Sequence, residues 1–248
     1  MYKFFIKTNQ IVEKLITIDN DDVNHIKNVL RLEIGQQIEI SNSDTGERFI
    51  CEILEYGNNS VICEIIEKTE DNSETKIYLH IFQGLPKSDK METIIQKGTE
   101  IGGKEFTPVA LNRCIVKLNG KDEAKKIERW RKISEGAAKQ SKRSIIPKVN
   151  SVIKLDEIIR QIKEYDIMLV AYEEEKENTI KQELQKLNKK ENLKIGIVIG
   201  PEGGIEKDEI DCLKQAGAKI VTLGNRILRT ETAPIVMASV IMYELDEM

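Results

Sequence analysis

Alternating apolar and polar residues dominate the first 70 residues of the chain. This period of two predicts half-buried β-strands, and turn-forming residues separate them. The strands are expected at 36–41 (QQIEIS), 47–56 (ERFICEILEY) and 60–67 (SVICEIIE). Residues 19–32 instead predict a short helix with an acidic start and with Val23, Ile26 and Val29 or Leu30 on one apolar face. Residues 1–70 are therefore expected to form a small β-barrel domain, followed by a polar linker at 69–75.

From residue 76 onward, short apolar runs alternate with segments of helical period. Strands are expected at 76–84, 106–111, 166–172, 194–200 and 218–224, and helices at 90–103, 122–143, 155–165, 178–190, 207–217 and 232–245. Strands that alternate with helices predict a mostly parallel sheet covered on both faces. The fold class expected for residues 76–248 is therefore α/β.

The last of these helices is apolar around nearly its whole circumference. The apolar positions are Ile235, Val236, Met237, Ala238, Val240, Ile241, Met242 and Leu245. Such a helix is buried, either in a core or against another subunit. The pattern leaves both alternatives open.

Composition places the chain among globular proteins, with 32% charged and 40% hydrophobic residues. No apolar run is long enough for a transmembrane helix, and charges interrupt the N-terminal segment, so neither a membrane span nor a signal peptide is expected. Four scattered cysteines predict reduced thiols in a cytoplasmic protein. With only two histidines, no metal site is expected.

Charge is distributed unevenly along the chain. The net charge is −4, yet residues 112–148 contain twelve Lys and Arg against four Asp and Glu, a local net of +8 that leaves −12 elsewhere. Within this segment Lys125, Arg129, Lys132, Lys139 and Arg143 recur at helical spacing and share one face. A solvated charged face is the simplest interpretation, but the density of cations favours binding of nucleic acid.

Two glycine-bearing loops follow neighbouring predicted strands. Residues 200–204 (GPEGG) follow the strand at 194–200, and residues 223–226 (LGNR) follow the strand at 218–224. Neither is a dinucleotide-binding GxGxxG motif or a P-loop, and each alone is compatible with a tight structural turn. Loops at adjacent strand ends nevertheless indicate a ligand crevice in an open α/β sheet.

The second loop leads into the mixed segment 226–233 (RILRTETA). Together with 200–204, and with 25–32 (HIKNVLRL), 97–102 (KGTEIG) and 137–147 (AAKQSKRSIIP), it resembles the signature of the ribosomal RNA small-subunit methyltransferase E family. The resemblance covers nearly the whole chain. Gly103 and Lys142 depart from the residues more usual in the family, outside the expected site.

The resemblance implies a trefoil-knotted methyltransferase domain of the SPOUT superfamily, with the knot and cofactor site in about 166–234, and a PUA-like RNA-binding N-terminal domain. It implies a cytoplasmic homodimer that uses S-adenosylmethionine to methylate N3 of a uridine in the decoding region of 16S rRNA. The assembled small subunit is the expected partner, although naked RNA stays open.

The resemblance also assigns roles to residues. Arg229, then Arg226, is expected to stabilise the uracil anion, and Glu231 or Glu202 to accept its proton unless these carboxylates are structural. Cofactor contacts are expected from Ala171, Tyr172, Gly200, Pro201, Glu202, Gly203, Gly204, Leu223, Gly224, Ile227 and Leu228. RNA contacts are expected from Arg31, Arg113, Lys125, Arg129, Lys132, Lys139 and Arg143.

Two rival functions are compatible with the same residues. The first is a non-catalytic RNA-binding protein. The second is a SPOUT enzyme that methylates tRNA or a ribose 2′-hydroxyl. The residues alone identify neither the nucleotide nor the general base, and they do not show which subunit grips which part of the RNA.

Overall fold

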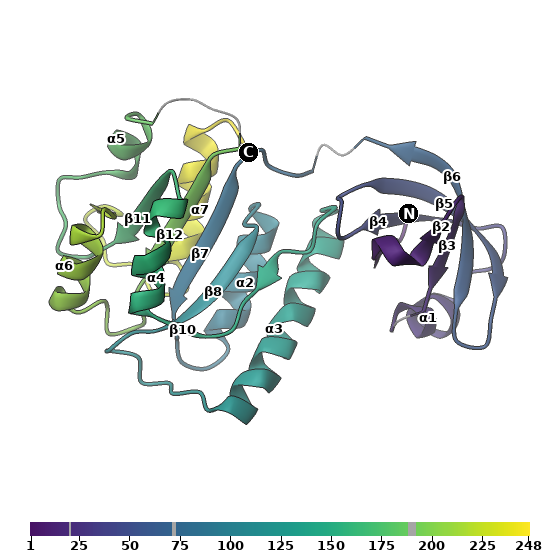
Figure 1. Ribbon diagram of the computed structural model, residues 1–248, viewed down its shortest axis with the longest axis horizontal. Helices are drawn as coiled ribbons and strands as arrows, with labels where there is room; N and C mark the ends of the chain where they lie inside the picture. The colour runs from purple at the N-terminus through teal and green to yellow at the C-terminus, as the bar shows by residue number, and fades with distance from the viewer. Residues whose placement is uncertain (20, 71–72, 188–191) are drawn as a thin grey trace. The chain divides into compact units, whose positions relative to one another are not determined.

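A computed structural model describes residues 1–19, 21–70, 73–187 and 192–248. The chain divides into two compact units (Figure 1). The first comprises Met1–Glu74 and Ala138–Ile146, and the second comprises Thr75–Ala137 and Pro147–Met248. Part of the expected linker and the end of the helix expected at 178–190 lie outside the described residues.

The first unit is built on a six-stranded sheet that curls around an apolar core. The strands are β1 (Lys3–Ile6), β2 (Ile11–Val12), β3 (Leu15–Ile18), β4 (Gln37–Asn42), β5 (Arg48–Tyr56) and β6 (Val61–Thr69), in the order β1-β4-β5-β6-β3-β2. Among the described residues of this unit, β1 and β4 pair in parallel and the other neighbouring strands pair antiparallel. The three predicted strands are confirmed as β4, β5 and β6, whereas β1, β2 and β3 were not predicted.

The helix expected at 19–32 is shorter than its apolar pattern suggested. One turn, α1 (Asp22–Asn24), continues directly into a π-helical turn at His25–Val29. Val23 and Ile26 are buried in the core of the first unit, as predicted for the apolar face. Of the two alternatives for the third position, Leu30 packs partly buried against the same core, whereas Val29 is 63% exposed.

Residues 138–146 belong to the first unit, although they include the end of the long helix Gly120–Gln140, most of which belongs to the second unit. Arg143 forms an ion pair with Glu74, with 2.6 Å between Nη2 and Oε2, and the backbone N–H groups of Ser144 and Ile145 donate to the same carboxylate. Lys139 forms an ion pair with Asp22 at 2.8 Å. This structural division therefore differs from the continuous ranges 1–70 and 76–248 expected from the sequence.

The second unit contains an all-parallel sheet. Its main path runs β10 (Ile153–Lys154), β8 (Glu105–Ala110), β7 (Tyr78–Gly84), β12 (Lys194–Ile199), β11 (Ile167–Ala171) and β13 (Lys219–Val221), and β9 (Lys148–Val149) pairs with β8. The helices are α2 (Lys90–Glu100), α3 (Gly120–Gln140), α4 (Leu155–Gln161), α5 (Ile180–Leu184), α6 (Lys207–Gln215) and α7 (Ala233–Glu244). A 3-10 turn lies at Ile162–Glu164 in this unit, and another lies at Thr8–Gln10 in the first unit. In Figure 1, α4 lies in front of the sheet and α7 behind it. This confirms the predicted α/β class with a parallel sheet.

The C-terminal helix α7 is buried along one side only. Its buried residues are Ala233, Pro234, Met237, Ala238, Ile241 and Met242. Ile235, Val236 and Val240 on the other side are partly buried, and Tyr243 is 73% exposed. The core accounts for one face of the helix, and the second apolar face is left accessible in the single chain.

A hydrogen-bonded polar network lies on the sheet among buried side chains. His80 on β7 contacts the hydroxyl of Tyr165 through Nδ1 at 2.6 Å and the hydroxyl of Thr107 through Nε2 at 2.7 Å. Burial lowers the pKa of His80 to about 4, although the nearby carboxylate of Glu105 opposes that shift. His80 is therefore a neutral, hydrogen-bonded core residue at neutral pH.

Candidate active site

A cavity of about 530 Å³ lies where neighbouring parallel strands of the second unit end. Its walls come from the segments after β11, β12 and β13 and from the start of α7, with Lys90 added from α2. Because β11 pairs in parallel with both β12 and β13, the carboxyl ends of these strands meet at one edge of the sheet. The crevice predicted from the two glycine-bearing loops is present.

A buried hydrogen-bond cluster joins the loops beneath the cavity. The Gln83 amide at the end of β7 donates to the Thr230 hydroxyl at 2.9 Å and to the carbonyl oxygen of Gly200 at 3.2 Å. Thr230 in turn donates to the same carbonyl at 2.7 Å. The threonine hydroxyl between Arg229 and Glu231 therefore anchors the 226–233 segment to the 200–204 loop.

Close backbone packing fixes the same floor. A Cβ at Gly84 would lie 2.6 Å from Cδ and 2.7 Å from the backbone nitrogen of Pro201, so only glycine fits. Gly204 has a φ of +73°, and a Cβ there would lie 2.5 Å from Oε1 of Glu173. These glycines allow the ends of β7 and β11 to approach the 200–204 loop.

Four charged side chains line up beside the cavity. The Lys90 Nζ lies 2.9 Å from Oε1 of Glu202 and 3.2 Å from Oε2 of Glu231, and Nη1 of Arg229 lies 4.0 Å from Oε1 of Glu231. Partial burial acts to raise the pKa of Glu202, but hydrogen bonds from Lys90 and from the backbone N–H of Lys87 hold it below its ordinary value. The same hydrogen bond to Glu202 favours the charged ammonium and raises the pKa of Lys90.

The structure brings the sequence-predicted cofactor and catalytic residues together. The cavity is lined by Ala171, Tyr172, Gly200, Pro201, Glu202, Gly203, Gly204, Leu223, Gly224, Arg226, Ile227, Leu228 and Arg229. Glu231 is joined to the rim through its ion pair with Lys90. The Arg229 side chain is 84% exposed, so its guanidinium is accessible to a ligand at the mouth of the cavity.

Sequence reasoning missed several residues of the same cavity. Lys90, Glu173, Lys176 and Thr230 all line it. Glu173 directly follows the predicted Tyr172, and Lys176 lies three residues after Glu173. The sequence signal for Glu173 was its place after a predicted strand end. Lys90 carried no such signal, because its partners Glu202 and Glu231 lie more than 100 residues away in the chain.

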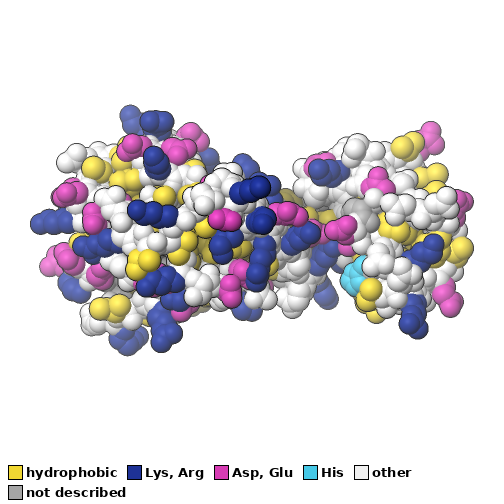
Figure 2. Space-filling model, turned by 90° about the horizontal axis from the view of Figure 1, so that it is seen from below, with side chains coloured by type: hydrophobic (Ala, Val, Ile, Leu, Met, Phe, Trp, Pro, Cys, Tyr) yellow, Lys and Arg dark blue, Asp and Glu magenta, His cyan; other side chains and the backbone are white. Residues whose placement is uncertain are grey.

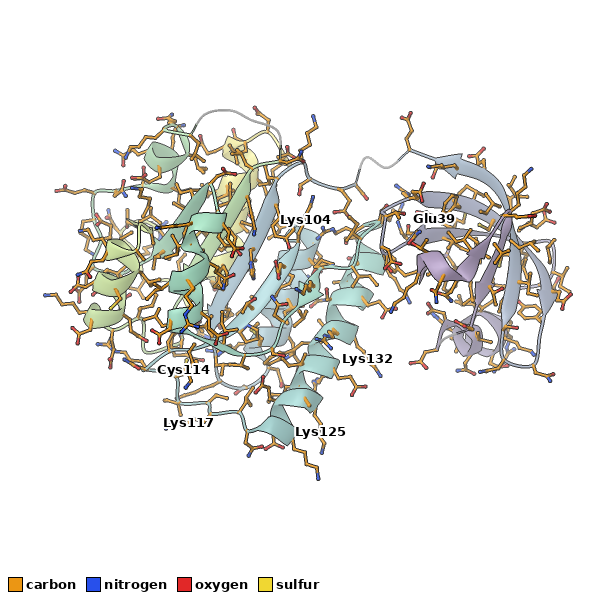
Figure 3. All side chains as sticks on the ribbon, viewed as in Figure 1. Glu39, Lys104, Cys114, Lys117, Lys125 and Lys132 are labelled. Carbon is orange, nitrogen blue, oxygen red and sulfur yellow. The ribbon has the colours of Figure 1, made fainter. Side chains whose placement is uncertain are left out.

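The predicted cationic stripe is only partly exposed. Lys125 is exposed, Arg129 is 63% exposed and pairs with Glu92 on α2 at 2.8 Å, and Lys132 is 66% exposed. Figure 3 labels Lys125 and Lys132 along α3 and Lys117 in the segment before it. In the view of Figure 2, Lys and Arg side chains are interspersed with Asp and Glu rather than forming an unbroken field.

Two residues of that stripe do not have the exposed position expected of them. The helix ends at Gln140, so Arg143 lies beyond it, and its side chain is 3% exposed against Glu74. Lys139 is 23% exposed and pairs with Asp22. Burial against carboxylates gives both cations a structural role in the first unit, which corrects the expectation that they belong to one solvent-exposed face.

The remaining predicted RNA-binding residues occupy different units. Arg31 is exposed in the first unit and has a φ of +52°. Arg113 lies beside the cavity loop, where Nη1 donates to the carbonyl oxygen of Gly203 at 2.9 Å. It also approaches Glu206 to 3.8 Å. The structure therefore places Arg113 close to the candidate active site.

The described parts of the chain contain neither a metal-binding cluster nor a membrane-spanning helix. Among residues 1–19, 21–70, 73–187 and 192–248, no three His, Cys, Asp or Glu side chains cluster in a way that would hold a metal ion. Within the same ranges, no helix combines the length and apolar character needed to cross a membrane. Cys51, Cys63 and Cys114 are buried free thiols, and Cys212 is exposed.

Comparison with known proteins gives consistent matches in both parts of the chain. The family model of an RNA methyltransferase domain matches residues 72–242, and that of an RNA methyltransferase PUA domain matches residues 18–66. A ribosomal RNA small subunit methyltransferase E of Bacillus subtilis (strain 168) is 40% identical over 253 residues, covering 99% of this chain and 98% of that protein.

Two solved structures are similar over nearly the whole chain. A ribosomal RNA small subunit methyltransferase E from Neisseria gonorrhoeae, bound to S-adenosyl methionine, is 27% identical with a TM-score of 0.85, covering 98% of this chain and 97% of that one. A Legionella pneumophila protein solved with bound cofactor SAM is 29% identical with a TM-score of 0.85, covering 97% of this chain and 96% of that one.

The fold, the cavity and the two domain matches define the chain as an RNA methyltransferase of the α/β SPOUT class with a PUA domain. Identity to the Bacillus subtilis protein extends over almost all of both chains. The chain belongs to the ribosomal RNA small subunit methyltransferase E family, as its motifs predicted.

Proposed function

We propose that this chain transfers the methyl group of S-adenosylmethionine to N3 of a uridine in the decoding region of 16S rRNA. The observation that carries the proposal is the cavity at the strand ends, which gathers the predicted cofactor residues and has the exposed guanidinium of Arg229 at its rim. The activity for which the relatives are named, and the S-adenosylmethionine bound in two similar structures, support the methyl donor and the class of RNA.

The chemistry of the cavity fits this donor. Apolar side chains of Ile199, Leu223 and Leu228 offer contact area for an adenine ring, and loop backbone groups offer hydrogen bonds. The carboxylate of Glu173 suits the hydroxyls of a ribose or a cationic ammonium group. When bound, S-adenosylmethionine supplies a methyl group on a positively charged sulfur, a strong electrophile.

The residues of this chain must make uracil N3 a nucleophile. N3 carries a proton, and its loss leaves negative charge shared with O2 and O4. Arg229, with Arg226 in support, stabilises this charge through charge-assisted hydrogen bonds. The proton passes to a carboxylate, the electron pair left on N3 forms the N–CH₃ bond, and the pair of the broken C–S bond returns to sulfur.

The two candidate carboxylates differ in their surroundings. Glu202 accepts hydrogen bonds from both Lys90 and the backbone N–H of Lys87. These bonds fix the start of α2 and the segment before it against the 200–204 loop. Glu231 pairs with the same Lys90 through Oε2 without accepting a hydrogen bond, and its Oε1 lies 4.0 Å from Nη1 of Arg229. We therefore assign the proton-accepting role to Glu231 and a structural role to Glu202.

The target base must leave its stack to reach the cavity, so flanking RNA has to be held elsewhere. We assign this grip to the exposed cations of α3, namely Lys125, Arg129 and Lys132, to Arg113 beside the 200–204 loop, and to the PUA domain with Arg31. Residues 1–70 would then serve RNA binding and residues 76–248 the transfer.

The accessible side of α7 supports a homodimer. Ile235, Val236 and Val240 are partly buried and Tyr243 is exposed, so pairing with a second copy would remove an apolar face from water. Because α7 begins at the cavity wall, the dimer interface would lie near the cofactor site. The enzyme would act in the cytoplasm, where its RNA partner is assembled.

Mass mapping of modified nucleosides tests the proposal. Naked 16S rRNA and small ribosomal subunits are prepared from a strain that lacks the enzyme, and each is incubated with the purified protein and S-adenosylmethionine. We expect 3-methyluridine in the decoding region, with the two preparations showing which form is the substrate. Ribose methylation, methylation of tRNA alone, or RNA binding without transfer would each contradict the proposal.

A further inference from the structure

Lys90 bridges the two loops that form opposite parts of the cavity. It lies at the first residue of α2, its side chain is 30% exposed, and it lines the cavity. Its Nζ approaches Glu202 at 2.9 Å and Glu231 at 3.2 Å. One ammonium group therefore joins the loop after β12 to the segment before α7.

Glu231 lies between two cations that compete for its carboxylate. Oε2 is buried and faces Lys90, close enough for charge pairing although not aligned for a hydrogen bond. Oε1 lies 4.0 Å from Nη1 of Arg229, which is too far for a hydrogen bond. Arginine and carboxylate groups that come within reach of each other form short, often two-pronged pairs.

We propose that Lys90 is a positioning residue for methyl transfer, because it holds the Glu231 carboxylate back from Arg229 and so leaves the guanidinium available to the target base. This inference rests on the proposed function. Without the ammonium, Glu231 is free to close on Arg229, and a guanidinium engaged by a carboxylate stabilises the negative charge of a uracil less well. Lys90 acts through Glu231 and does not itself touch the base.

A double-mutant cycle tests this role. Single-turnover methylation of small subunits is measured for the wild type, Lys90→Met, Glu231→Gln and the double variant, alongside affinity for S-adenosylmethionine by calorimetry. We expect Lys90→Met to slow transfer about tenfold or more while cofactor affinity changes less than about threefold. The double variant should be no slower than Glu231→Gln alone, because a neutral amide cannot trap Arg229.

Two further variants separate positioning from general stability. Lys90→Arg keeps a cation for Glu231 and should restore most of the rate, and Lys90→Gln is measured in parallel in case the methionine variant folds poorly. Lys97→Met serves as the matched control, since Lys97 lies on the same helix and pairs with Glu100 on the surface at 2.8 Å. Its rate should match the wild type.

The outcomes are distinguishable. Losses that multiply in the double variant, a parallel collapse of cofactor affinity in Lys90→Met, or no rescue by arginine would each overturn the role of Lys90 while leaving the proposed function intact. A wild-type protein that transfers no methyl group to small-subunit RNA would refute the proposed function, and the role of Lys90 with it.

Discussion

Three consecutive residues, Arg229, Thr230 and Glu231, have side chains in three different surroundings. The Arg229 side chain is 84% exposed at the mouth of the cavity, whereas Thr230 is 7% exposed and bonds to the Gly200 carbonyl below. Glu231 turns toward Lys90. Cation, hydroxyl and carboxylate occur side by side in the sequence because each faces a different neighbour.

Replacing Arg229 by alanine removes the guanidinium without disturbing the buried anchor at Thr230. Loss of one charge-stabilising donor typically costs about 10²- to 10³-fold in rate, so Arg229→Ala should slow methyl transfer by that factor. Calorimetry should show S-adenosylmethionine bound within a few-fold of the wild-type affinity. Turnover at the normal rate would remove Arg229 from the mechanism.

Gly84 at the floor of the site leaves no room for a larger side chain. Gly84→Ala forces a Cβ against the backbone of Pro201, and such overpacking costs about 1–3 kcal/mol of unfolding free energy. Gly136→Ala is the matched control, because no atom lies within 4 Å of the added Cβ in α3 and alanine favours helix by about 0.5–1 kcal/mol. Denaturant unfolding should show opposite signs for the two variants, and equal stabilities would refute the packing account.

The positions of site residues were predictable where they are contiguous in sequence. The segments 200–204 and 223–230 lie together at the cavity, as their order after two strands indicated. Lys90 was not predictable, because ion pairs between distant segments leave no periodic trace. Arg143 was misplaced for a related reason, since a count of cations does not reveal that Glu74 buries one of them.

At the scale of elements, α3 is amphipathic, with its exposed cations concentrated before its last turn. Trp130 and Ile127 are buried on one side, while Lys125, Arg129 and Lys132 remain accessible. Nucleic-acid affinity at this helix should therefore depend on these three residues rather than on Lys139, which Asp22 engages.

Charge reversal on α3 tests this surface. The double variant Arg129→Glu, Lys132→Glu should weaken RNA binding at low salt and reduce the dependence of affinity on salt, because each lost phosphate contact removes close to one released counterion. Lys214→Glu on the exposed side of α6 is the control. If the RNA affinity of the double variant equals that of the wild type at both low and high salt, these cations form an ordinary solvated surface and do not bind RNA.

Elements with a clear period were predicted well, and short or irregular ones were not. The alternating strands β4, β5 and β6 and the strand–helix alternation of the second unit are present. β1 has a continuous apolar run, FFI, without alternation, and β2, β9 and β10 have two residues each, too few to show any period. The knot expected within 166–234 concerns how the chain is threaded, which no local pattern records, and it stays a prediction.

For the whole molecule, the His80 network makes stability depend on pH. The unfolded chain protonates this histidine near pH 6.5, whereas in the folded state burial lowers the pKa to about 4. The stabilisation is therefore complete above about pH 6.5 and falls as the pH drops toward 4, by up to about 3 kcal/mol. Burial acts to raise the pKa of Glu105, but the charge of a protonated His80 and hydrogen bonds from Asn150 and Tyr78 hold it below 4.5, so the contribution of this carboxylate is lost only as the pH falls below that value.

Denaturant titrations from pH 7 to pH 4 check this expectation. The wild type should lose unfolding free energy steadily over the interval, and His80→Gln should show a smaller slope, since only the contribution of the carboxylates remains. Identical slopes for the two proteins would show that His80 is not held neutral by burial.

The position of the bound methyl donor is the most direct test of the proposed mechanism. A crystal structure of the protein with S-adenosylhomocysteine measures this directly. The adenosine should lie between the 200–204 and 223–228 loops, with the sulfur directed toward the mouth of the cavity beside Arg229. Product bound at another place on the chain, or bound with its sulfur turned away from Arg229, would contradict the account.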